Sequence, residues 1–325
     1  MIAAGLGCAT ISADRLERQP LASSREWVSA LHRDHPLVGR IWSVRERRFV
    51  DESDLLAALA HADFVLLGET HDNRDHHILQ ARLIRAVCGT GRRPSLAFEM
   101  LAANKQAAVD GVLSDPAATP EELAAAVDWK HAGWPDFDLY RPVFAAGMEA
   151  RVPVVAAGLS PEAFKQFSSQ GLRAFPQPVR TLLEHAGPLT PDAQRRMEEE
   201  MGKEHCGKLP PTVLERLVLL QRARDAQLAE RLLTTAASGS PAAGQGGAIL
   251  IAGSGHVRND RAVPAFISRE APKRSVVAVA FLEVLPAVAD PGGYAAEFHS
   301  ESLPVDFVVF TPAAEREDPC LSVKR

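Results

Sequence analysis

Short apolar runs recur along this chain, and most are followed by a segment whose apolar residues have helical spacing. The run at 63–68 is typical, since it is almost entirely apolar and ends in glycine, as strands buried on both faces do. Strands that alternate with helices favour an α/β fold, with a mostly parallel central sheet and helices on both faces. We expect strands at 63–68, 95–100, 152–156, 248–252, 275–281 and 305–310.

The spacing of these elements predicts one domain over 36–325, preceded by a lead-in over 1–35. Alternating apolar and polar residues predict a hairpin at 38–50. The region 160–235 has the pattern of a helical insertion, and it includes a long helix at 212–234. Other helices are expected at 52–60, 74–87, 103–113, 120–127, 141–150 and 260–269.

The charge balance excludes one class of partner. The formal net charge is −5 and no basic stripe stands out, so we expect no nucleic-acid surface. No apolar run approaches the roughly 18 residues that a membrane span needs. Contact with a membrane is therefore expected only through a lipid anchor.

The segment 1–8 resembles the end of a bacterial lipoprotein signal, because small and apolar residues run into Cys8. It lacks the charged start and the full apolar stretch of a working signal. Two interpretations stay open: a truncated lipoprotein signal in which Cys8 carries the lipid, or a frayed terminus.

The other cysteines differ in their surroundings. Cys88 falls on the apolar side of a predicted helix and is expected in the core. Cys206 and Cys320 lie in loop-like segments far apart in the sequence. An oxidising compartment would let these two pair in a disulfide, and the alternative is two unrelated thiols.

Three predicted strands end in residues that carry chemistry. Glu69 and His71 follow the run at 63–68, and their spacing of two points both side chains the same way in an extended segment. Glu99 ends the next strand, and His256 follows a Gly-Ser-Gly turn after a later one. Ligands bind beyond the carboxyl ends of parallel strands, so we expect these four side chains in one pocket.

Three more residues are candidates because they lie near these four. Arg258 comes two positions after His256 and can meet an anion. Gln221 and Asp225 interrupt the apolar stripe of the helix at 212–234. Buried polar groups need partners, so these two either support the site from behind or sit at the stripe edge in water.

One function that these residues allow is haem binding. A haem site needs an apolar slot, an axial ligand and cations for the propionates. The chain has two tyrosines, Tyr140 and Tyr294. Tyr140 follows an aromatic stretch with Trp134 that suits stacking on a porphyrin, or that simply packs a loop. His76 and His77 are weaker candidates and are expected at the surface.

The alternative is a metal-dependent or general-base hydrolase, such as a peptidase or an esterase. Glu69, His71 and His256 would then bind a divalent metal ion or activate water, and Glu99 would shuttle protons. These four residues are the catalytic candidates. The chain has no Gly-x-Ser-x-Gly elbow, and Cys206 is adjacent to a histidine that it is not expected to face. The residue chemistry alone favours the hydrolase.

The order of the motifs adds a family resemblance. The motifs are Gly68-Glu-Thr-His71-Asp-Asn with His76-His77, Phe98-Glu99-Met100, Trp134-Pro-Asp-Phe with Tyr140, His205-Cys-Gly, Gln221-Arg-Ala-Arg-Asp225 and Gly253-Ser-Gly-His256-Val-Arg. They resemble the ChaN-like family of haem-binding, iron-regulated lipoproteins, which belongs to the Tiki and erythromycin-esterase-like superfamily. The resemblance extends roughly over 42–319.

The resemblance implies an α/β fold, a location in the bacterial cell envelope (the periplasm or the outer membrane) and a homodimer that encloses haem. It implies a tyrosine as the iron ligand, for which Tyr140 and Tyr294 are the candidates, and a histidine, His71 or His256, that helps to hold a propionate. An outer-membrane haem receptor is an implied partner. On this basis the sequence predicts a haem-binding protein of iron uptake, with haem as cofactor, and leaves the metal-dependent hydrolase as the alternative.

Overall fold

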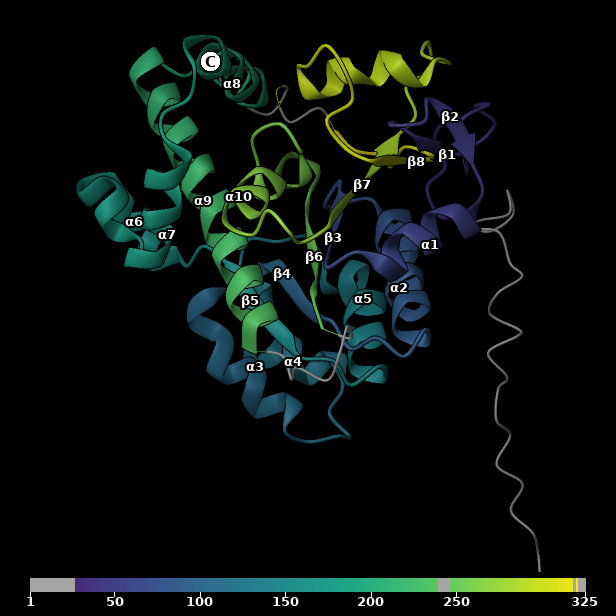
Figure 1. Cartoon of the computed structure of the whole chain (residues 1–325), viewed down its shortest axis with the longest axis horizontal. Helices are drawn as coiled ribbons and strands as arrows, with labels where there is room; N and C mark the ends of the chain where they lie inside the picture. Colours follow the sequence, from purple (N-terminus) through teal and green to yellow (C-terminus); the bar gives the residue numbers. More distant parts are fainter. Residues whose placement is uncertain (1–26, 239–245, 318–319, 321–325) are drawn as a thin grey trace, which may run out of the picture.

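A computed structural model describes residues 27–238, 246–317 and 320 (Figure 1). The predicted lipoprotein signal with Cys8 lies outside the described residues. The strands are β1 (Ile41–Ser43), β2 (Arg48–Val50), β3 (Phe64–Glu69), β4 (Ser95–Ala102), β5 (Val154–Gly158), β6 (Ala248–Gly253), β7 (Val276–Glu283) and β8 (Phe307–Thr311). They form one sheet in the order β2-β1-β8-β7-β3-β6-β4-β5.

The helices separate most of these strands. The α-helices are α1 (Glu52–His61), α2 (Arg74–Gly89), α3 (Gln106–Leu113), α4 (Pro120–Ala126), α5 (Phe137–Glu149), α6 (Pro161–Gln170), α7 (Gln177–Ala186), α8 (Pro191–Glu204), α9 (Pro211–Ser238) and α10 (Val263–Glu270). The 3-10 helices are η2 (Ala103–Lys105), η3 (Trp129–His131), η4 (Gly171–Ala174), η5 (Ser254–Val257) and η6 (Pro291–Phe298).

The sheet is mostly parallel. Every pairing from β8 across to β5 is parallel, and only β1 and β2 add antiparallel strands at one edge. The predicted hairpin at 38–50 is the β1–β2 pair, in which Ile41 lies opposite Val50. The α/β fold with a mostly parallel sheet, which the strand and helix pattern predicts, is confirmed.

Both faces of the sheet are covered by helices, so successive strand residues enter two different cores. Val65 and Leu67 pack with side chains of α1, α2 and α5, whereas Phe64 and Leu66 pack with side chains of α7, α9 and α10. The sheet lies between these two groups of helices (Figure 1). This arrangement leaves the strand ends as the place where polar groups can reach a ligand.

Helix α5 begins four residues earlier than the sequence pattern predicts. The Asp136 side chain accepts from the backbone N–H of Asp138 and caps the helix at Phe137. Pro142 lies inside the helix, at its sixth residue, where it cannot donate a backbone hydrogen bond to the carbonyl of Asp138. Tyr140 is therefore a helical residue with its side chain in the core.

The segment at 160–235, predicted as a helical insertion, forms α6, η4, α7, α8 and most of α9. Its parts have different roles. Helix α9 packs against β4, β5 and β6, so it belongs to the crossover between β5 and β6. Helix α8 contacts α9 through a small separate cluster of Met197, Met201 and Val218.

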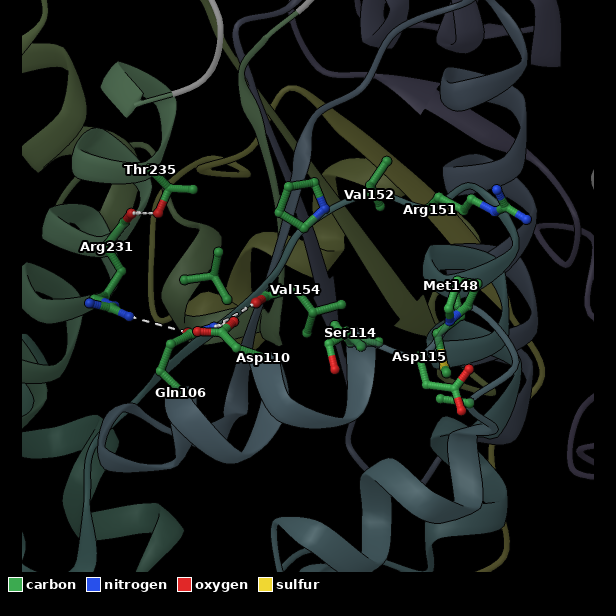
Figure 2. A pocket seen from close by; sticks show the side chains of 15 residues that line it. Gln106, Asp110, Ser114, Asp115, Met148, Arg151, Val152, Val154, Arg231 and Thr235 are labelled. Atoms are coloured by element: carbon green, nitrogen blue, oxygen red, sulfur yellow. Dashed lines mark hydrogen bonds between the residues drawn. The ribbon is translucent and has the colours of Figure 1, made fainter.

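Side chains form hydrogen bonds to the backbone of the edge strand β5. Gln106 accepts from the backbone N–H of Ala156 over 2.7 Å and donates to the carbonyl of Val154 over 2.9 Å. Arg231 donates to the carbonyl of Ala156 over 3.2 Å. Figure 2 shows Gln106 and Arg231 beside this strand, where they line a cavity of about 580 Å³. The hydrogen-bonding groups at this edge are thus used within the molecule.

Among the described residues, no helix combines the length and the apolar character needed to cross a bilayer.

Candidate functional site

The carboxyl ends of β3, β6 and β4 lie side by side. Strand β6 lies between the other two, and Glu69 pairs in register with Gly253. The backbone N–H of Gly253 donates to Oε2 of Glu99 over 2.9 Å and so links β6 to β4. His71 follows β3, and His256 lies in η5 directly after β6. The structure brings Glu69, His71, Glu99 and His256 together around one cavity of about 380 Å³.

Glu69 is a buried carboxylate whose two oxygens are fully used. Its Oε1 accepts from the hydroxyl of Tyr140 over 2.6 Å and from Nδ1 of His71 over 3.0 Å. Its Oε2 accepts from Gln80 over 2.7 Å and lies 3.2 Å from Nδ1 of His77. Burial would raise the pKa of Glu69, but the charge on His77 and the hydrogen bonds from both histidines hold it below its usual value. Glu69 is therefore ionised and orients His71.

The His71 ring is held at one nitrogen and open at the other. Nδ1 is bound to Glu69, whereas Nε2 lies 4.0 Å from Oε2 of Glu99 and has no hydrogen bond to any described residue. The side chain is 33% exposed, and its ring packs edge-on against Trp134 at a centroid distance of 5.0 Å. Burial would lower the pKa of His71, but the hydrogen bond to Glu69 and the charge of Glu99 raise it. Nε2 is thus a basic nitrogen at the cavity.

His256 bridges two buried carboxylates. Its Nε2 lies 3.1 Å from Oε1 of Glu99 and its Nδ1 lies 2.6 Å from Oδ1 of Asp225. Burial would lower the pKa of His256, but the charges of Glu99 and Asp225 raise it to about 9. Glu99 also pairs with Arg224, and the pKa of Glu99 is lowered because these charges outweigh its burial. His256 is therefore a cation at neutral pH and holds the two carboxylates in place.

Helix α9 supplies the groups behind His256. Gln221 and Asp225, which interrupt its apolar stripe, both reach the imidazole of His256, with Nε2 of Gln221 3.3 Å from Nδ1. The sequence pattern does not single out Arg224, because an arginine at this position of the helix is expected to face solvent. The signal that predicts it is Glu99, since a buried carboxylate needs a cation or donors nearby.

The sequence-based prediction that His76 and His77 lie at the surface is wrong. Both side chains are fully buried. His77 contacts Glu69 and the carbonyl of His71, and His76 lies 2.9 Å from the hydroxyl of Thr311. They are buried because the first turn of α2 packs over the ends of β3 and β8, where the backbone and the carboxylate supply polar partners.

Two predicted cofactor residues lie elsewhere. Tyr294 is fully buried in η6, where its hydroxyl accepts from the N–H of Leu285 and donates to the carbonyl of Val288. Arg258 is 1% exposed, and its guanidinium donates to Asp260 and to the carbonyl of Phe298. Neither side chain lines the cavity beside His71. The cavity includes Arg261 instead.

The divalent-metal alternative finds no supporting geometry in the described part of the chain. No group of three or more His, Cys, Asp or Glu side chains there is arranged to hold a metal ion. Both ring nitrogens of His256 already face carboxylates, so this histidine does not complete a ligand set with Glu69 and His71.

The predicted disulfide is present. Cys206, just after α8, and Cys320 form a disulfide with a Cα–Cα distance of 5.6 Å. Cys88 is a free, buried thiol, as its place on the apolar side of α2 predicts. The disulfide joins the segment after β8 to the loop between α8 and α9, two helices that line the site cavity.

The chain is similar to several solved structures. ChaN of Campylobacter jejuni, in a structure of its cofacial haem binding, is 20% identical over 83% of this chain and 95% of that chain, with a TM-score of 0.60. The type III effector HopBA1 is 16% identical over 79% and 91%, with a TM-score of 0.44. A mutant of the erythromycin esterase EreC is 11% identical over 86% and 99%, with a TM-score of 0.40. The ChaN structure supports the α/β fold.

The sequence itself gives the family. No curated protein matches the chain significantly. The family model described as haem-binding uptake, Tiki superfamily, ChaN matches residues 55–267, which include Glu69, His71, Glu99 and His256. This match covers more than half of the chain, and therefore the chain belongs to the ChaN family of haem-binding uptake proteins in the Tiki superfamily.

Proposed function

We propose that this chain binds haem and that Nε2 of His71 is the protein ligand of the iron. The observation that carries the proposal is the environment of this ring: a buried carboxylate holds Nδ1, and Nε2 faces the cavity without a hydrogen bond to a described residue. A histidine that ligates a metal commonly donates its other N–H to a carboxylate, which fixes the ring and raises its basicity.

The surrounding residues fit haem. Trp134, half-buried, offers an aromatic wall in contact with the His71 ring. Arg224, whose side chain is 33% exposed, and Arg261 offer cations beside the same cavity. When bound, haem would supply an iron centre that a nitrogen ligand can hold. His71 would hold the group, and Trp134 and the arginines would orient it.

The iron ligand in this proposal differs from the tyrosine that the sequence suggests. Tyr140 is fully buried and donates its hydroxyl to Glu69, which together with burial raises the pKa of the phenol. The hydroxyl of Tyr294 already accepts one hydrogen bond and donates another. A phenolate ligand would require either side chain to leave the core.

The family also supports a proposal for the wider role. We infer a place in the bacterial cell envelope, where haem or iron is taken up, with a homodimer that encloses the haem and an outer-membrane receptor as partner. Membership of a haem-binding uptake family supports the role in uptake. The Cys206–Cys320 disulfide supports the location, because disulfides persist in oxidising compartments such as the periplasm.

Titration of the purified chain with ferric haem tests the proposal. We expect a shifted Soret band that saturates at a defined stoichiometry, and His71→Ala should weaken binding and change the spectrum. His185→Ala is the matched control, because His185 is an exposed histidine paired with Glu270 and lines neither the cavity at His71 nor the one beside it. Saturable binding with an unchanged spectrum in His71→Ala would remove His71 as the ligand, and absence of saturable binding would refute haem binding.

The hydrolase alternative depends on the same histidine. His71, held and made more basic by Glu69, can take a proton from a water at Nε2. Under this alternative the haem-free chain would hydrolyse an ester or a peptide, and Glu69→Gln would lower the rate. We favour haem binding because the family is a haem-binding one.

A further inference from the structure

A second cavity of about 290 Å³ lies next to the His71 site. It is bounded by the end of β4, by η2 and η3, and by the start of α6. Glu99 lines both cavities, and Trp134, which touches the His71 ring, lines this one. Met100 and Leu159 add apolar surface. A ligand held at His71 can therefore extend past Trp134 into this space.

The acidic side chains around this cavity already have partners. Glu162 accepts from the amide of Asn104 over 3.0 Å. Asp128 lies 2.8 Å from Nδ1 of His131. Glu99 is neutralised by the cations of the first cavity. Each of these carboxylates thus has a hydrogen-bond or ion-pair partner in the described chain, and none of them forms an ion pair with Lys105.

Two donors of the cavity are unused. The ammonium group of Lys105, a half-buried residue at the end of η2, has no hydrogen-bond or ion-pair partner among the described residues. The indole N–H of Trp134 also lacks one, whereas that of the neighbouring Trp129 donates to the carbonyl of Pro135 over 2.9 Å. Both unused donors are open to solvent, because no fully buried polar side-chain atom in the described chain is left unsatisfied.

We propose that this cavity is a carboxylate subsite, in which Lys105 pairs with a carboxylate of the ligand whose ring system lies against Trp134. An ammonium group that has no ion-pair partner among the described residues can bind an anion without first breaking an ion pair. The inference rests on the proposed function, since haem carries its carboxylates on short arms from a flat apolar ring. It assigns Lys105 as the residue that receives one of them.

The test compares three ligands in the full chain. Ferric haem has carboxylates and iron, metal-free protoporphyrin IX has carboxylates alone, and haem dimethyl ester has iron alone. Lys105→Met should weaken binding of the first two by roughly tenfold and leave the ester unchanged, because only the carboxylate contact is lost. Lys105→Arg should restore most of the affinity. Lys130→Met is the control, because Lys130 is exposed on η3 and does not line the cavity.

The outcomes separate this inference from the haem proposal. If Lys105→Met binds all three ligands as the wild type does, the subsite is refuted while haem binding at His71 stands. If Lys105→Met weakens protoporphyrin IX but His71→Ala leaves haem unaffected, the subsite stands and the iron ligand is wrong. If neither haem nor protoporphyrin IX binds, both proposals are refuted.

Discussion

The hydroxyl of Tyr140 donates to Oε1 of Glu69 over 2.6 Å, and neither side chain is exposed to solvent. The same hydroxyl lies 3.1 Å from Nδ1 of His71. Tyr140 thus acts on the site through Glu69 and His71 while it remains a neutral phenol inside the core.

Tyr140→Phe should keep haem binding and cost roughly 1–2 kcal/mol of unfolding free energy, because one hydrogen bond to a buried charge is lost while the ring stays. Urea denaturation and a haem titration measure the two effects. Tyr294→Phe is the control, since it also removes a buried hydroxyl, but one away from His71. A large change of the haem spectrum in Tyr140→Phe alone would indicate that Tyr140, and not His71, ligates the iron.

Gly253→Ala should weaken haem binding without unfolding the protein. A Cβ at this position would lie 3.0 Å from Nε2 of His71 and 3.3 Å from its Cε1, so the ring must shift. The φ of Gly253 is −58°, which alanine adopts without strain. Gly255→Ala is matched to it, because a Cβ there meets no atom within 4 Å. Equal affinities of the two variants would show that the position of His71 is not critical.

Stability should fall as the pH rises through about 9, the raised pKa of His256. A pKa raised by folding stabilises the native state fully below the unfolded value, 6.5, and the contribution disappears above the folded one. The contribution is about 3 kcal/mol. Denaturation between pH 6 and pH 10 measures it.

Asp225→Asn provides the comparison for this pH dependence. It removes one of the two carboxylates that raise the pKa of His256, so the decline in stability should move to lower pH. An identical pH profile in wild type and Asp225→Asn would contradict a charged His256 between two carboxylates.

The double variant Cys206→Ser, Cys320→Ser should lower the unfolding free energy by roughly 2–4 kcal/mol, because the bond closes a long loop with a sequence separation of 114. Reduced wild type should behave like the variant, and reductant should have no further effect on the variant. Thermal melts with and without reductant decide the point. Unchanged stability after verified reduction would mean that ion pairs hold α8 in place without the disulfide.

The polar residues at the strand ends could be predicted because they follow from short sequence patterns. An apolar run followed by Glu69 and His71, or ended by Glu99, places polar groups at the same edge of any parallel sheet. The order of the strands in the sheet could not be predicted in this way, because β6 lies between β3 and β4 although it is distant from both in the sequence. That order decides which groups touch, and it depends on long-range packing that local patterns do not contain.

The partners of buried charges were the least predictable part. The sequence places His77 in the first turn of a helix, a position that is usually solvated, and only the packed structure shows that Glu69 lies beneath it. The sequence pattern predicts a helix only from residue 141, because the aromatic stretch and Pro142 hide the start of α5. Tyr140 instead lies inside this helix, and its hydroxyl donates to Glu69.

The side chains that bond to the edge of β5, Gln106 and Arg231, also limit how copies of this protein can associate. A strand from another molecule would need the N–H and carbonyl groups that Gln106 and Arg231 already occupy. It would have to displace both side chains before the ladder could continue. At this edge the sheet therefore resists growth into fibrils at high local concentration, and assembly must use side-chain surfaces.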